Sequence, residues 1–116
     1  MAQSDAADRP LANTIFHILI ALADQPRHGY GIMLDVAERT NQSLKLSPGT
    51  LYGAIKQLLA DGLIEEVDSR AVRSDDERRR YYRLTRDGRE TARREMARMS
   101  ALLGQARMTS LKAREG

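Results

Sequence analysis

The sequence predicts a mainly α-helical protein with a small β-hairpin, and three observations support this fold class. Apolar residues recur with a helical period in three segments before Gly62. Two short segments, 63–67 and 80–84, are rich in β-branched and aromatic residues and flank a charged stretch. From Thr85 onwards the apolar residues follow a heptad-like pattern without a strong helix breaker. A length of 116 residues suits one compact domain with one appendage.

The first two helices are predicted over residues 10–24 and from about residue 28 to Thr40. Gln25-Pro26-Arg27 separates them, because proline disfavours helix in the residue before it. The first helix is expected to pack on the core through Leu11, Ile15, Ile18, Leu19 and Leu22. The second is expected to use Tyr30, Met33, Leu34 and Ala37, with Ile32 and Val36 widening the face.

For the third helix, the sequence predicts the start, the buried face and the end. Ser47 is a good N-cap, Pro48 suits the first helical position, and Gly62 suits the residue just past the end. Leu46 and Leu51 sit where a hydrophobic staple would close the start. The core stripe is Leu51, Ile55, Leu58 and Leu59, and the opposite face carries Thr50, Tyr52, Gly53, Lys56 and Gln57. Hydroxyl, phenol, cation and amide groups on one face suit the groove of a nucleic acid.

The two strands predict a hairpin with a long charged tip. Alternation places Tyr82 and Leu84 towards the core, and Tyr81 and Arg83 on the other side. Three helices followed by such a hairpin is the order of a winged helix-turn-helix, in which one helix enters the groove and the wing touches the backbone. The chain therefore divides into a flexible tail (1–9), a winged helix-turn-helix domain (10–84) and a C-terminal dimerisation helix (85–116).

The C-terminal helix predicts self-association. Thr85 suits its N-cap, and Asp87 lies favourably in its first turn. Apolar residues then recur every three or four positions and form a seam of Ala92, Met96, Met99, Leu103 and Ala106. Because no second helix of the chain is predicted to cover this seam, we expect a homodimer. A monomer with the helix folded back on its own domain is the alternative.

Charge is distributed unevenly along the chain. The formal net charge is +3, but residues 1–69 carry five Lys or Arg against nine Asp or Glu, and residues 70–116 carry fourteen against seven. The basic residues of segment 70–116 are almost all arginines. Arginine binds phosphate in a planar, bidentate manner. A nucleic acid is therefore the expected partner. The chain has no cysteine and no apolar run that could span a bilayer, so a cytoplasmic protein without membrane contact is expected.

Four blocks of the sequence together resemble the PadR family of bacterial transcriptional regulators. They are His28-Gly29-Tyr30-Gly31-Ile32, Leu46 to Tyr52, Asp61-Gly62-Leu63-Ile64, and Arg80 to Gly88. The single C-terminal helix is similar to the compact subgroup of that family. The resemblance implies a winged-helix homodimer that binds palindromic double-stranded operators, mostly as a repressor. It also implies release from DNA by a small lipophilic or aromatic effector.

The residues expected to contact DNA lie on the third helix and in the wing. Ser47, Pro48, Gly49 and Thr50 are placed to meet phosphate at the helix start, and Tyr52, Lys56 and Gln57 to reach base edges or backbone. In the wing, the candidates are Arg73, Arg78, Arg79 and Arg80. A solvated charge run is the alternative for these arginines.

No catalytic, metal or cofactor site is predicted. Ser47 lacks plausible His and Asp partners, and Gly29-Tyr30-Gly31 lacks the strand and turn of a phosphate-binding loop. The two histidines, His17 and His28, do not make a metal site, and His28 is expected to cap a helix or form a turn. Two other functions stay open: a winged-helix adaptor for protein contact, and an RNA-binding module.

Overall fold

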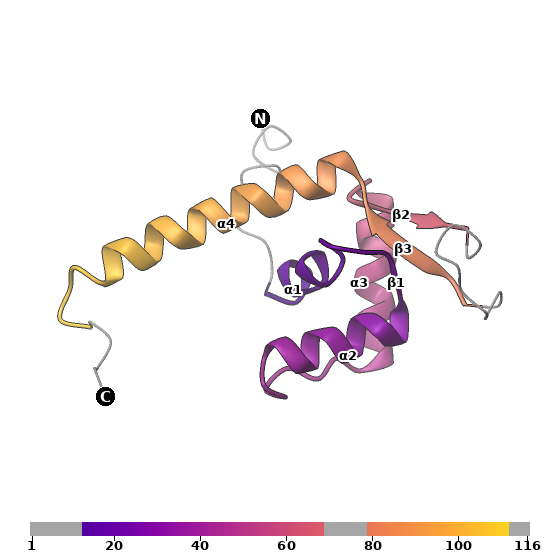
Figure 1. Ribbon diagram of the computed structural model, residues 1–116, viewed down its shortest axis with the longest axis horizontal. Coiled ribbons are helices and arrows are strands. Elements are labelled where there is room, and N and C mark those ends of the chain that lie inside the picture. Colours follow the sequence, from indigo (N-terminus) through magenta and orange to yellow (C-terminus); the bar gives the residue numbers. More distant parts are fainter. Residues whose placement is uncertain (1–12, 69–78, 112–116) are drawn as a thin grey trace.

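The computed structural model describes residues 13–68 and 79–111 and is mainly helical, with one small antiparallel sheet. In chain order the elements are α1 (Asn13–Ala21), β1 (Arg27–His28), α2 (Gly29–Arg39), α3 (Pro48–Ala60), β2 (Ile64–Val67), β3 (Tyr81–Leu84) and α4 (Arg86–Ala106). Figure 1 shows α1, α2, α3 and the sheet gathered into one body, from which α4 extends. The predicted fold class, a winged helix-turn-helix with a long C-terminal helix, is confirmed.

The core lies where α1, α2 and α3 meet the inner face of the sheet. Its fully buried side chains include Ile18 and Leu19 of α1, Ile32 and Val36 of α2, and Leu51 and Leu58 of α3; Ile64, Tyr82 and Leu84 close it from the strands. Full burial of one such side chain contributes about 1.5–3 kcal/mol. The predicted core positions of α3 and of the strands are thus confirmed, apart from Leu59, whose side chain is 37% exposed at the edge of the stripe.

The predicted core face of α2 is wrong in part, at Tyr30 and Leu34. Ile32 and Val36 are fully buried, whereas Tyr30 and Leu34 are more than half exposed. The apolar residues of α2 lie on nearly every side of the helix. Its hydrophobic pattern therefore fits two orientations against the core. The structure selects the one in which two β-branched side chains, four residues apart, enter the space between α1 and α3. α1 is also shorter than expected: it ends at Ala21, and residues 10–12 lie outside the described part.

The sheet has a third strand that the sequence did not predict. β1 pairs with β3 in antiparallel register, Arg27 opposite Tyr82 and His28 opposite Tyr81, and β2 pairs with the other edge of β3. The segment around Pro26 was expected to be only a break between helices. Because β1 leads directly into α2, the wing and the helix-turn-helix share one backbone hydrogen-bond network. The tip of the predicted hairpin, residues 69–78, lies outside the described residues.

α3 begins and ends as its sequence predicts. The Thr50 N–H donates to Ser47 Oγ at 3.2 Å, and Pro48 occupies the first helical position. At the other end Gly62 has φ +74°, the Leu63 N–H donates to Leu58 O, and the Gly62 N–H donates to Leu59 O. These bonds make a Schellman motif, which satisfies the last carbonyls of the helix and turns the chain into β2.

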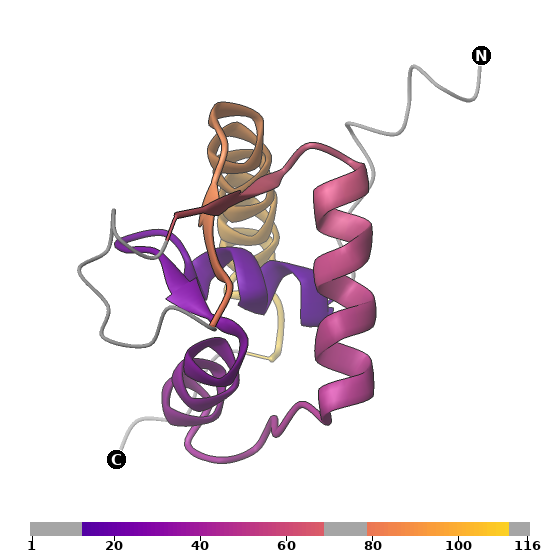
Figure 2. The same ribbon diagram turned by 90° about the vertical axis from the view of Figure 1, so that its right-hand side faces the viewer.

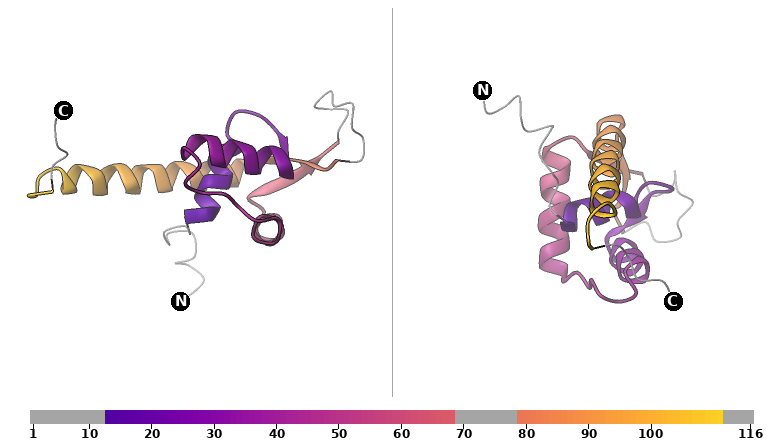
Figure 3. Two further views of the ribbon diagram at one scale, coloured as in Figure 1. Left: turned by 90° about the horizontal axis from the view of Figure 1, so that it is seen from below. Right: turned by 90° about the vertical axis from the view of Figure 1, so that its left-hand side faces the viewer.

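α4 is attached to the end of α3 and then leaves the body. Thr85 caps α4, donates its hydroxyl to Gly62 O at 2.6 Å, and donates its N–H to Leu63 O at 3.1 Å. The first half of α4 passes over α1, and the second half continues beyond the other elements (Figures 1 and 3). Its 21 residues span about 32 Å. The helix ends at Ala106, earlier than expected, and residues 107–111 form turns.

Candidate nucleic-acid interface

The outer face of α3 is open to solvent along its whole length. Figure 2 shows α3 at the edge of the body, with the side away from α1 uncovered. All seven candidates on this helix are exposed: Ser47, Pro48, Gly49, Thr50, Tyr52, Lys56 and Gln57. The structure therefore brings them together on one accessible surface, opposite Leu51, Ile55 and Leu58 in the core.

These polar groups differ in how far they are already engaged within the chain. Gln57 donates its amide to both carboxylate oxygens of Asp61, at 3.0 and 3.1 Å, which leaves its carbonyl oxygen to accept. Ser47 and Thr50 bond to each other through their hydroxyls at 3.0 Å. Lys56 has no ion pair or hydrogen bond with any described residue. Lys56 is thus the cation of this face that is ready to meet an anion.

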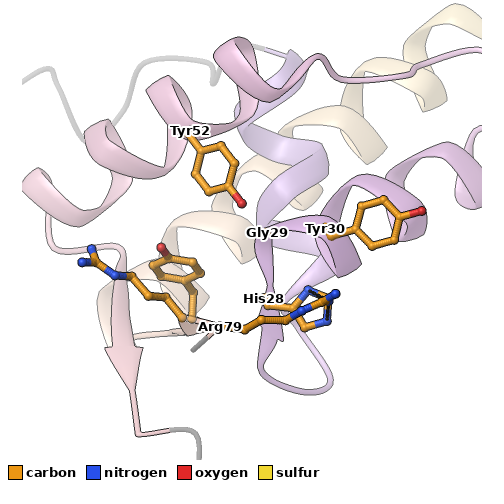
Figure 4. Close-up of a pocket in the computed structure, with 7 residues that line it drawn as sticks. His28, Gly29, Tyr30, Tyr52 and Arg79 are labelled. Atoms are coloured by element: carbon orange, nitrogen blue, oxygen red, sulfur yellow. Dashed lines mark hydrogen bonds between the residues drawn. The ribbon is translucent and has the colours of Figure 1, made fainter. Parts of the chain in front are cut away.

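Tyr52 extends away from α3 towards the beginning of α2. In Figure 4 its ring crosses the gap between the two helices and its hydroxyl approaches Gly29. A Cβ on Gly29 would overlap that hydroxyl and would lie 2.7 Å from the Tyr52 Cζ. Gly29 is therefore the residue that leaves room for Tyr52 in this position, a role that sequence analysis missed. The contact joins α2 and α3 through two residues that lie 23 positions apart in the sequence.

A pocket of about 430 Å³ opens between α3, the start of α2 and β3. It is lined by His28, Gly29, Tyr30, Tyr52, Arg79, Arg80 and Tyr82. His28 is the N-cap of α2, as expected, and accepts the Gly31 N–H at 3.0 Å through Nδ1. Its imidazole packs edge-to-face against Tyr81. The Arg79 guanidinium lies 2.8 Å from the His28 Nε2 (Figure 4). Burial raises the pKa of the Tyr82 phenol, which forms one wall of this pocket.

Two of the four wing candidates fall within the described residues. The Arg80 side chain is largely exposed, and its Nε lies 4.0 Å from a Glu66 carboxylate oxygen, too far for a hydrogen bond. Arg83, by contrast, pairs with Glu65 at 2.7 Å. Arg73 and Arg78 lie outside the described residues. The described part of the wing thus contributes Arg79 beside the pocket and Arg80 at the surface.

The seam of α4 is only partly covered by its own chain. Met96, Met99 and Leu103 are exposed, as is the neighbouring Leu102. Ala92 packs against the core, and Ala106 is half-buried. A row of large apolar side chains on the free half of a helix is typical of an interaction surface.

The body that carries these surfaces is held by arginines at the end of α1. Arg27 donates to Ala21 O at 2.7 Å and pairs with Asp35 of α2 at 3.2 Å. Arg89 of α4 donates to Ala23 O at 3.1 Å. Guanidinium groups at a helix C-terminus satisfy its free carbonyls and complement its dipole. These bonds fix α1, α2 and α4 relative to one another, and therefore the seam relative to α3.

In the part of the chain that the structure describes, no three His, Asp or Glu residues gather as a metal ion would require. Among the same residues, no helix combines the length and apolar character needed to cross a membrane.

A three-helix body with a small sheet and an open, polar third helix defines a winged helix-turn-helix protein. The family model of the transcriptional regulator PadR-like family matches residues 18–94, and the chain belongs to this family. The family is one of transcriptional regulators and not of enzymes, which agrees with the absence of a predicted catalytic site.

Solved structures agree with this assignment. A PadR family transcription regulator from hypervirulent Clostridium difficile R20291 superimposes with a TM-score of 0.71 and 27% identity, covering 82% of this chain and 95% of that one. A PadR-like transcription factor from Bacteroides fragilis gives a TM-score of 0.64 and 25% identity, covering 80% and 85%.

Two uncharacterised proteins are also similar in sequence. One is a 37.1 kDa protein in transposon TN4556 of Streptomyces fradiae. It is 37% identical over a segment that covers 75% of this chain but only 23% of its own length. The chain thus spans about a quarter of that relative. The other, protein X of Lysinibacillus sphaericus, is 31% identical over 73% of both chains.

Proposed function

We propose that this protein is a sequence-specific double-stranded DNA-binding repressor that acts in the cytoplasm as a homodimer on a palindromic operator. The observation that carries the proposal is the two-sided character of α3. One side of the helix closes the core, and the other presents Ser47, Thr50, Lys56 and Gln57 to solvent. A helix held so firmly by its body, with its polar side free, is suited to enter a major groove.

The dimer is proposed from the exposed seam of α4. Met96, Met99 and Leu103 would be buried against the same seam of a second copy, since a two-fold axis makes one patch complementary to itself. Two α3 helices about one helical turn apart, roughly 34 Å, would then meet successive major grooves. Arg79 and Arg80 of each wing would bind the flanking backbone.

A small lipophilic or aromatic effector would lie where a partner encloses the methionines of α4, because methionine adapts to ligands of different shape. Its binding would move the two α3 helices out of register with the operator and release the DNA.

Selection of bound sequences from random duplex DNA tests the proposal. We expect a palindromic motif whose half-sites are one helical turn apart, and an affinity that falls steeply with salt because neutralised phosphates release counterions. An adaptor for protein contact would enrich no motif. An RNA-binding module would be competed by structured RNA better than by duplex DNA.

Matched charge variants then test the role of α3. Lys56→Gln and Arg94→Gln each remove one positive charge from an exposed helix position, the first on the proposed interface and the second on α4. We expect only Lys56→Gln to weaken operator binding. If Lys56 binds phosphate, the two copies in a dimer lower the slope of log K against log salt by about 1.8. If it binds a base, the selected motif loses its preference at one position of each half-site. Equal effects of both variants would argue against α3 as the recognition helix.

A further inference from the structure

We propose that the pocket between α3, the start of α2 and β3 binds one backbone phosphate of the DNA, and that Tyr52, seated against Gly29, donates a hydrogen bond to it. The inference rests on the proposed function and refines it, because the sequence alone allows Tyr52 to contact either a base edge or the DNA backbone. It makes Tyr52 a residue that positions the protein on DNA, and Gly29 the residue that positions Tyr52.

The direction of the Tyr52 side chain is the first argument. Its ring leans from α3 across to Gly29 and into the pocket (Figure 4). The hydroxyl therefore points back towards the body of the domain and not outwards from the helix face, where base edges would lie. Base edges are met at the floor of the groove, while phosphates pass along its rim beside the protein body.

The chemistry of the pocket is the second argument. The Tyr52 side chain is half-exposed, and its hydroxyl has no hydrogen-bond partner among the described residues. Arg79 and Arg80 line the same pocket, where the Arg79 guanidinium lies against the His28 imidazole. A pocket that offers a phenolic O–H donor and two arginines suits an anion with several acceptor oxygens, and a phosphate diester is such an anion.

The tight fit at Gly29 is the third argument. A Cβ there would overlap the Tyr52 hydroxyl, so any larger residue must displace the hydroxyl end of the Tyr52 side chain. Gly31, two positions further along α2, offers a matched control. A Cβ at Gly31 would meet only ordinary contacts, the closest 3.5 Å from the His28 ring.

Operator duplexes with single methylphosphonate linkages, which are uncharged, provide the test. With the wild-type protein, a methylphosphonate at this phosphate in each half-site should weaken binding about tenfold, because the linkage has lost its charge. Tyr52→Phe should weaken binding of the unmodified operator to a similar extent and should no longer respond to that linkage. The sequence motif selected by Tyr52→Phe should match that of the wild type.

Gly29→Ala, compared with Gly31→Ala, tests whether the position of Tyr52 against Gly29 matters for DNA binding. Gly29→Ala should weaken operator binding, Gly31→Ala should not, and Gly29→Ala should add nothing in a Tyr52→Ala background. Circular dichroism checks that each variant is folded, and Tyr52→Phe tests the proposal independently should Gly29→Ala fail to fold.

Two results would overturn the inference while leaving DNA binding intact. The first is a changed base preference for Tyr52→Phe, which would make Tyr52 a base-contacting residue. The second is an unchanged methylphosphonate response in this variant. Failure to bind any duplex would instead refute the proposed function itself.

Discussion

Replacing Gly88 by alanine tests how α4 is fixed to the end of α3. An ideal Cβ at this position would overlap Leu63 O and would lie 2.9 Å from the Leu63 carbonyl carbon and 3.3 Å from its Cα. All three are backbone atoms, so no rotation of a side chain can relieve the contact. Either α4 moves outwards or the turn after α3 opens.

The expected loss of stability follows from these contacts. Forcing a methyl group into a filled space costs about 1–3 kcal/mol. The shift also strains the two hydrogen bonds from Thr85 to Gly62 O and Leu63 O, each worth about 1 kcal/mol. Alanine recovers at most about 1 kcal/mol through its higher helix propensity. We expect a net loss of about 2 kcal/mol, which lowers the melting temperature by roughly 8–16 °C for a domain of this size.

Urea unfolding followed by circular dichroism measures this loss, at one fixed protein concentration because association would shift the midpoint. Gly53→Ala in α3 is the matched control, since a Cβ there meets nothing within 4 Å. It should raise the unfolding free energy by up to about 1 kcal/mol. A midpoint for Gly88→Ala at or above that of Gly53→Ala would refute the reasoning.

Three further predictions concern the turn after α3, the core phenol and the seam. Gly62→Ala should lower the unfolding free energy by about 1–2 kcal/mol, because φ is +74° there, and Gly62→Asn should cost less; the reverse order in urea unfolding would contradict the Schellman turn. Burial raises the pKa of Tyr82 above 10.0, so the stability it contributes is complete below pH 10 and is lost as pH rises through the folded-state pKa. The unfolding free energy of the wild type should therefore fall more steeply above about pH 10 than that of Tyr82→Phe, and parallel pH curves would exclude this effect. Leu103→Glu should reduce the mass measured by light scattering to that of one 13.0 kDa chain, while Ala101→Glu on the opposite face of α4 should not; a wild-type mass for Leu103→Glu would remove the seam from the dimer interface.

The predictable parts of this fold are those in which local and tertiary preferences agree. The bounds of α3 follow from Ser47, Pro48 and Gly62, each of which satisfies a backbone requirement that depends on few neighbours. His28 and Thr85 cap α2 and α4 for the same reason. The orientation of α2 could not be predicted in this way, because its apolar residues are spread around the helix and only packing decides which of them are buried.

β1 could not be predicted because its two residues carry no strand pattern of their own. Arg27 and His28 become a strand when β3 lies beside them, and β3 lies far along the chain. The same limit applies to the candidate site. The exposed face of α3 follows from the helical period of its apolar residues. The position of the Tyr52 side chain, in contrast, depends on the backbone of Gly29 in another helix.

The contact between Gly29 and Tyr52 also gives the candidate interface a division of roles. A side chain that contacts a base must be free to extend outwards from α3, and among the described polar groups Lys56 meets that condition best. Gln57 is partly held by Asp61, while Tyr52 is turned towards the pocket. Residues fixed by the body would thus set the register on the DNA backbone, and Lys56 would read the sequence. Differences in operator preference between related proteins of this fold are then expected to follow the residue at position 56 more closely than the residue at position 52.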